Sequence, residues 1–128
     1  MSDLSTATTQ ITQMLTMQDA MNSRVSDTWK NNNYEWYRAI WVECAEMLDH
    51  HGWKWWKAQT LDLPQVQMEL VDVWHFALSH MIIQHHGDIN KAASDIEAAL
   101  KTSDPLIEFD GITFDFSKNN LVENAMHH

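Results

Sequence analysis

Apolar residues recur at helical spacing through most of the chain. Four segments show the i, i+3, i+4 pattern of amphipathic helices. They cover residues 8–25, 34–51, 64–86 and 89–101. In the third segment apolar side chains occur nearly all round the helix, which predicts a helix at the centre of a bundle. The pattern therefore predicts an all-α fold, a bundle of four to five helices.

Glycine, proline and polar residues separate these segments. Gly52 predicts the end of the second helix, Pro64 fits the first turn of the third, and Gly87-Asp88 predicts the start of the fourth. Beyond Ser103-Asp104-Pro105 the helical pattern stops. The alternation of Ile112, Phe114 and Phe116 is typical of a short strand or an extended segment, and Ser117 could begin a last short helix. At 128 residues we expect a single domain over residues 1–128.

Two pairs of acidic residues lie in the most apolar helices. Glu43 and Glu46 in the second helix, and Glu69 and Asp72 in the third, are each spaced i, i+3, so both carboxylates of a pair share a face. Those faces are otherwise apolar. A buried carboxylate without a partner costs several kcal/mol, so four of them must be compensated.

The compensating charge does not come from a basic residue of either helix. No Lys or Arg occurs between Arg38 and Lys54, or between Lys57 and Lys91. Four carboxylates that converge without a basic partner suit a hard divalent cation such as Mg²⁺. The sequence therefore predicts a metal site formed by these four acids.

Composition narrows the class of protein. A formal charge of −10 and a pI near 5.0 argue against a general nucleic-acid-binding surface. The single cysteine, Cys44, excludes an internal disulfide and is predicted to be a small buried hydrophobic residue. No run of about 18 apolar residues indicates a membrane span, and the first residues lack the pattern of a signal peptide. We therefore expect a cytoplasmic protein without nucleic-acid or membrane partners.

Several polar residues have both a structural and a functional interpretation. Gln18 lies on the apolar stripe of the first helix and Asn22 follows one turn later, so the two amides either join helices by hydrogen bonds or read the edge of a planar ligand. His75, three residues after Asp72, is either a hydrogen-bonded core residue or part of the same site. The histidine doublets, of which His50-His51 is the first, are interpreted as helix-end residues, because adjacent side chains diverge by about 100°.

A run of tryptophans and lysines follows the second helix. In Trp53-Lys54-Trp55-Trp56-Lys57 the lysines either interact with the negative end of the helix dipole or contact phosphates beside an aromatic wall. If this turn is helical, Lys54 and Lys57 share a face, as do Trp53 and Trp56.

With these motifs the chain resembles the all-α nucleoside triphosphate pyrophosphohydrolases, and among them the dimeric dUTPases. The resemblance covers roughly residues 10–86. The residues that carry it form four runs. They are Met17-Gln18-Asp19-Ala20-Met21-Asn22, Glu43-Cys44-Ala45-Glu46, Trp53-Lys54-Trp55-Trp56-Lys57 and Glu69-Leu70-Val71-Asp72-Val73-Trp74-His75-Phe76. The double acidic motif is shared with MazG-like and dCTP-cleaving relatives, whereas the last two runs are more specific to the dUTPase branch.

The resemblance implies Mg²⁺-dependent hydrolysis of dUTP, and of dUDP, to dUMP by a homodimer. It implies that Mg²⁺ is held by four acids and that the nucleotide contacts eight further residues. The metal ligands would be Glu43, Glu46, Glu69 and Asp72. The substrate-binding residues would be Gln18, Asn22, Trp53, Lys54, Trp56, Lys57, His75 and Phe76. In this scheme the amides meet the uracil, His75 and Phe76 line the deoxyribose pocket, and the lysines approach the phosphates. A ligand carboxylate can double as general base, and Glu46 is our candidate.

The chain departs from the family's longer members, which continue with a Lys/Asn/Arg-rich segment that closes over the phosphates. We expect the domain to lack that segment. Three rival interpretations stay open at this point. They are a MazG-like or dCTP-directed pyrophosphohydrolase, a di-iron bundle, for which only Asp72-Val73-Trp74-His75 approximates the required Glu-x-x-His motif, and a non-enzymatic helical partner protein.

Overall fold

The protein, seen in a computed structural model, is described for residues 2–109 and 111–115. Its elements follow the predicted order. They are α1 (Ser2–Val25), a 3₁₀ helix η1 (Trp29–Asn31), α2 (Trp36–His51), α3 (Leu63–Gln84), α4 (Ile89–Thr102), β1 (Leu106–Phe109) and β2 (Ile112–Asp115). The all-α fold is confirmed, and the four predicted helices are present. The first of them begins at Ser2, six residues before the predicted start.

Local chemistry explains where the helices end. Gly52 has a φ of 90° and follows the last residue of α2 in the left-handed conformation, which glycine adopts without steric cost. At the start of α3 the Asp62 carboxylate accepts a hydrogen bond of 3.3 Å from the Gln65 backbone N–H. At the start of α4 Asp88 accepts one of 3.0 Å from the Lys91 backbone N–H. These caps satisfy N–H groups that have no partner within their helix.

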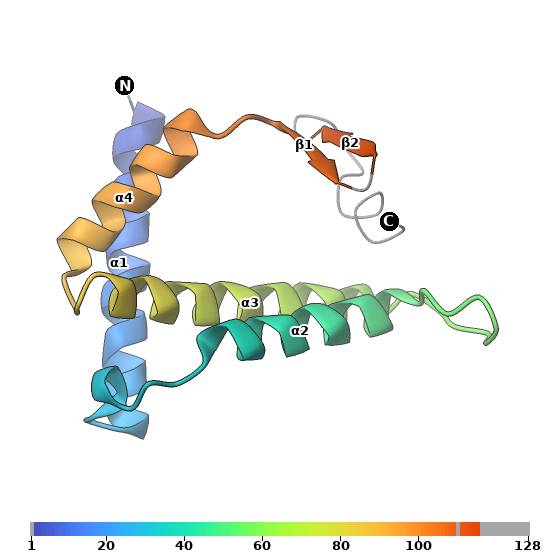
Figure 1. Cartoon of the computed structure of the whole chain (residues 1–128), viewed down its shortest axis with the longest axis horizontal. Helices are drawn as coiled ribbons and strands as arrows, with labels where there is room; N and C mark the ends of the chain where they lie inside the picture. The colour runs from blue at the N-terminus through green and yellow to red at the C-terminus, as the bar shows by residue number, and fades with distance from the viewer. Residues whose placement is uncertain (1, 110, 116–128) are drawn as a thin grey trace.

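The helices form two packed pairs that cross. α2 and α3 run antiparallel along each other, and α4 lies along α1 (Figure 1). α1 crosses the pair near the C-terminal end of α3, so α3 contacts each of the other three helices. The prediction that the third helix is central is confirmed by these contacts.

The apolar core lies at this crossing. Its buried residues come from α1, η1, α3 and α4, and they form one connected cluster. They are Ile11, Leu15, Trp29, Leu78, Ile82, Ala92 and Ala93. By contrast, no residue of α2, a helix described along its whole length, is buried.

Two predictions about burial are wrong. Cys44 is exposed, because among the described elements α2 packs mainly against α3 and leaves its other faces uncovered. The apolar stripe of α1 is buried only in its first part, at Ile11 and Leu15, whereas Met21 and Val25 are exposed because α1 extends past the crossing.

The segment after α4 forms a two-stranded antiparallel hairpin. Leu106 pairs with Asp115 and Phe109 with Ile112, and Gly111 in the turn has a φ of 74°. The extended conformation predicted around Ile112 and Phe114 is confirmed, whereas Phe116 and Ser117 lie outside the described residues. Among the described helices, none is both long and apolar enough to cross a lipid bilayer.

Candidate metal and nucleotide site

Three of the four predicted metal ligands converge between α2 and α3. One oxygen each of Glu43, Glu69 and Asp72 lies within 4.8 Å of the others. Glu69 is only 7% exposed, and the other two are half-buried. The i, i+3 spacing turns Glu69 and Asp72 to one side of α3, and packing of α2 on that side brings Glu43 to them.

The surroundings of Glu43 in this cluster raise its pKa. A hydrogen bond to the Glu69 side chain, then desolvation, then the charges of Glu46, Glu69 and Asp72 raise the pKa of Glu43 to about 7. Near neutral pH, and without other cations, Glu43 is therefore protonated in part of the molecules. A divalent cation would replace that proton and offset the remaining repulsion. The donor set consists of carboxylate oxygens, which suits Mg²⁺.

Two residues border the cluster. Glu46 lies one turn after Glu43 on α2 but is exposed and is outside the group of three. Its predicted roles as ligand and base stay predictions. The ring of His50, in the last turn of α2, lies 3.5 Å from a Glu69 oxygen. The interpretation of His50 as a helix-end residue missed this approach, although its position seven residues after Glu43 places both on one face of α2.

A closed ring of polar side chains joins α1 to α3 at the crossing. Gln18 donates to Asn22 over 2.9 Å, Asn22 donates to the Ser79 hydroxyl over 2.9 Å, and Ser79 donates to the His75 backbone carbonyl over 3.0 Å. The His75 ring closes the circle with a hydrogen bond between its Nδ1 and the Gln18 side-chain oxygen. The two amides therefore do join helices, as one of the two sequence interpretations predicted. Ser79, which is fully buried, was missed because it is a single small residue in an apolar run.

Gln18 and His75 also line a pocket. It has a volume of about 370 Å³, and its remaining walls are apolar. Those walls are formed by Met14, Met17, Met21, Val71, Trp74 and Leu78. A mostly apolar pocket with a few convergent polar groups is the usual form of a small-molecule site.

The comparisons with known proteins agree with this chemistry. A family model described as dUTPase matches residues 10–126. The chain belongs to the dUTPase family. It is a dUTP diphosphatase, an enzyme of the nucleoside triphosphate pyrophosphohydrolase class, as the motifs predicted. No curated protein and no solved structure matches the chain.

In this dUTPase the tryptophan–lysine run is a turn rather than a helix, and it lies at the end of α2 and α3 that is remote from α1 (Figure 1). Trp56 contacts both Trp53 and Trp55 edge-to-face, and Lys54 forms an ion pair of 3.0 Å with Asp49. His75 lies twelve residues after Leu63, which corresponds to about 18 Å along α3. Within one subunit, therefore, the structure does not bring this turn to the Gln18–His75 pocket.

The Phe76 ring contacts Trp36, which the resemblance did not imply. Its ring lies 6.0 Å from that of Trp36, which in turn contacts Trp29 edge-to-face. Phe76 thus joins α3 to the start of α2, and it is not among the residues that line the 370 Å³ pocket. The predicted contact of Phe76 with deoxyribose stays a prediction.

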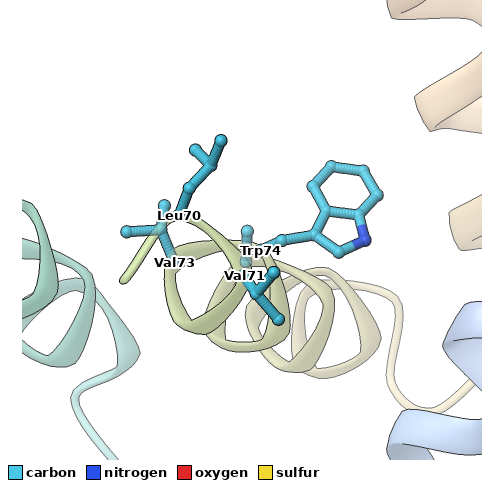
Figure 2. A pocket seen from close by; sticks show the side chains of 5 residues that line it. Leu70, Val71, Val73 and Trp74 are labelled. Atoms are coloured by element: carbon cyan, nitrogen blue, oxygen red, sulfur yellow. The ribbon is translucent and has the colours of Figure 1, made fainter. Parts of the chain in front are cut away.

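A second, wholly apolar hollow of about 420 Å³ lies on the outer surface of α3. It is lined by Leu70, Val71, Val73, Trp74 and Ala77. Figure 2 shows the side chains of Leu70 and Trp74 projecting from the helix. We call this surface the α3 outer face. It is uncovered in the single subunit.

Proposed function

We propose that this dUTP diphosphatase requires Mg²⁺ and that Glu43, Glu69 and Asp72, together with Glu46, hold it. The observation that carries the proposal is the convergence of three carboxylate oxygens within 4.8 Å, one of them on a buried residue. Bound Mg²⁺ would neutralise phosphate charge and lower the pKa of a water molecule at the α-phosphate. Glu46 is exposed, and it could accept a proton from that water as general base.

The nucleoside end of the substrate is proposed to occupy the pocket lined by Gln18 and His75. Two facts support this orientation. The pocket is apolar apart from these two residues, which suits a base and a deoxyribose. His75 also lies six residues after Glu69 on α3, about 9 Å along the axis. That separation suits a nucleotide whose base lies in the pocket and whose phosphates lie at the carboxylates.

Lys54 and Lys57 are proposed to contact the phosphates from the opposite side of the carboxylates. They lie in the turn after α2, at the end of the α2–α3 pair that is remote from α1 (Figure 1). Trp53 and Trp56 in the same turn are too far from Gln18 to form a wall for the base within one subunit. Any contact they make with the nucleotide is therefore proposed at its phosphate end or at the site of a second subunit.

We also propose that the enzyme is a homodimer and that the α3 outer face lies in its interface. The chain exposes 9400 Å², whereas a compact monomer of 14.9 kDa exposes about 7,000 Å². Stable dimers bury about 1,200–2,000 Å² or more. Large apolar side chains exposed on the neighbouring helices α2 and α3 would fit such an interface. These are Tyr37, Trp41 and Val42 on α2 and Met68, Leu70, Val71 and Trp74 on α3.

The direct test is a panel of dUTP, dCTP, dTTP and UTP, each with Mg²⁺ and each with a chelator, assayed for pyrophosphate release. We expect cleavage of dUTP to dUMP and pyrophosphate, at least about tenfold faster than that of dCTP, and no cleavage with the chelator. Preferential cleavage of dCTP would instead support the dCTP-directed alternative. Undiminished cleavage with the chelator would contradict the metal assignment.

A further inference from the structure

The ring of polar side chains between α1 and α3 has a fixed direction. A backbone carbonyl can only accept, so the single proton of the Ser79 hydroxyl is committed to the His75 carbonyl. The hydroxyl oxygen then accepts from the Asn22 amide nitrogen. As a result, the Asn22 side-chain oxygen is left to accept from the Gln18 amide nitrogen.

The hydrogen bond between Gln18 and His75 determines which nitrogen of the His75 ring carries the proton. Because the Gln18 nitrogen donates to Asn22, it is the Gln18 oxygen that faces His75 Nδ1. That oxygen accepts, so Nδ1 carries the proton. In the neutral imidazole the other nitrogen, Nε2, is then a bare acceptor. Among the described residues Nε2 has no hydrogen-bond partner, and His75 lines the 370 Å³ pocket.

We propose that Ser79 is a positioning residue that sets the tautomer of His75, so that the pocket presents an acceptor at His75 Nε2 beside a donor at Gln18. One proton of the Gln18 amide nitrogen is used by Asn22, and the second is available to a ligand. The proposal rests on the proposed nucleotide site and specifies which hydrogen-bonding groups of a ligand that site selects.

The ligand chemistry that fits is a carbonyl oxygen together with an N–H or O–H donor. A uracil edge has this combination, because O2 and O4 accept and N3–H donates. In cytosine N3 is itself an acceptor and cannot donate to His75. The 3′-hydroxyl of the deoxyribose is the other donor that a uracil nucleotide offers. The proposal is therefore that His75 Nε2 accepts from N3–H or from the 3′-hydroxyl.

The first experiment reads the tautomer directly in the protein without nucleotide. Long-range proton–nitrogen NMR of protein labelled at histidine, with the His75 signal assigned through His75→Gln, reports which ring nitrogen carries the proton. We expect protonated Nδ1 and unprotonated Nε2. A protonated Nε2 with bare Nδ1 would overturn the proposal, whether or not the protein binds nucleotides.

The second experiment removes the anchor of the ring. Ser79→Ala frees Asn22 and Gln18 to rotate, so we expect a mixture of His75 tautomers and about tenfold weaker binding of dUMP. Binding of dCMP should be unchanged if N3–H is the donor, and should weaken by the same factor if the 3′-hydroxyl is the donor, because dCMP has the same hydroxyl. Ser79→Thr keeps the hydroxyl and should restore both readouts. The control is Ser103→Ala, because the Ser103 hydroxyl also donates to a backbone carbonyl, that of Leu100, at the end of α4. A folded Ser79→Ala protein with the wild-type tautomer and the wild-type affinity for dUMP would overturn the proposal.

The third experiment distinguishes the two donors. In the wild type, weaker binding of dCMP than of dUMP indicates N3–H, whereas weaker binding of 2′,3′-dideoxyuridine monophosphate indicates the 3′-hydroxyl. If both analogues bind as tightly as dUMP, the acceptor role of His75 is refuted. If the wild type binds no uridine nucleotide at all, the proposed nucleotide site fails, and the tautomer measurement still decides whether Ser79 positions His75.

Discussion

The two halves of α3 lie in different surroundings. Its C-terminal half meets α1 and α4, and there Leu78 and Ile82 are buried in the apolar cluster. Its N-terminal half pairs with α2, where acids face each other and apolar side chains such as Leu70 lie exposed. The C-terminal half has what a stable fold needs within one subunit. The N-terminal half has charges and apolar surface that bound ions, substrate or another subunit can compensate.

This difference indicates that the two parts of the molecule have different roles. A well-packed crossing of helices holds the polar ring and the pocket in place, while the α2–α3 pair carries the acids that are proposed to bind the metal. Substitutions near the two halves should therefore have different consequences. Four tests, given below, compare them.

The largest effect is expected for the acids in the N-terminal half of α3. Glu69→Gln or Asp72→Asn should lower turnover of dUTP on the order of 10³-fold, because each removes a charge that is proposed to hold the metal. The fold should be retained, since removal of a negative charge relieves repulsion in the cluster. Steady-state kinetics and thermal unfolding without metal measure the two effects.

The matched control for these acids is Asp27→Asn, in the exposed loop after α1. It should leave both turnover and unfolding unchanged. Wild-type turnover in Glu69→Gln would show that the carboxylate cluster is not the metal site.

The next largest effect is expected in the apolar core, where α1 packs against the C-terminal half of α3. Leu15 is fully buried, so Leu15→Ala should lower the free energy of unfolding by about 2–5 kcal/mol. Trp41 on α2 is 74% exposed, so Trp41→Ala should change it by less than about 0.5 kcal/mol in the isolated subunit. Chemical denaturation at subunit concentrations low enough to dissociate a dimer makes this comparison. A larger loss for Trp41→Ala than for Leu15→Ala would contradict the assignment of the core.

A third pair of variants tests the uncovered surface. Leu70 on the α3 outer face and Leu100 on α4 are similarly exposed, at 51% and 55%. Leu70→Glu should weaken self-association about 100-fold, because a carboxylate would be buried without a partner in the interface. Leu100→Glu should leave self-association unchanged. Sedimentation over a range of concentrations measures both, and equal behaviour of the two variants would place the interface elsewhere.

The smallest effect is expected at the junction of α3 and α4. The ring of His85 donates to the Met81 carbonyl over 2.8 Å and to Asp95 over 2.6 Å, so both nitrogens carry protons. The hydrogen bond to Asp95, and then that to Met81, raises the pKa of His85. The hydrogen bond from His85 lowers the pKa of Asp95.

The signs of these shifts define a pH window. The contribution of His85 to stability is complete below its unfolded pKa of 6.5 and is lost as the pH rises through the raised value. That of Asp95 is complete above 3.8 and is lost as the pH falls through the lowered value. His85→Gln should therefore reduce stability mainly between pH 3.8 and 6.5, with a smaller difference at pH 9. Thermal unfolding against pH measures this, and a difference independent of pH would show that the pair does not contribute as a charge.

The structure bears out some sequence predictions and not others for identifiable reasons. The approach of His50 to Glu69 could have been inferred from the seven-residue spacing to Glu43. No sequence signal, by contrast, indicates that Ser79 anchors the ring that contains Gln18. That contact joins residues 57 positions apart and depends on the angle at which α1 crosses α3.

The sequence by itself determined the helices, their ends, the shared face of each acidic pair and the dUTPase motifs, because helix periodicity and capping depend on residues within one or two turns of each other. Only the tertiary structure decided which faces meet. It joined Glu43 to Glu69 and Asp72, left Glu46 and Cys44 exposed, and separated Trp53 from the pocket. The reason is that the crossing and pairing of helices depend on packing between residues distant in the sequence, which local spacing does not encode.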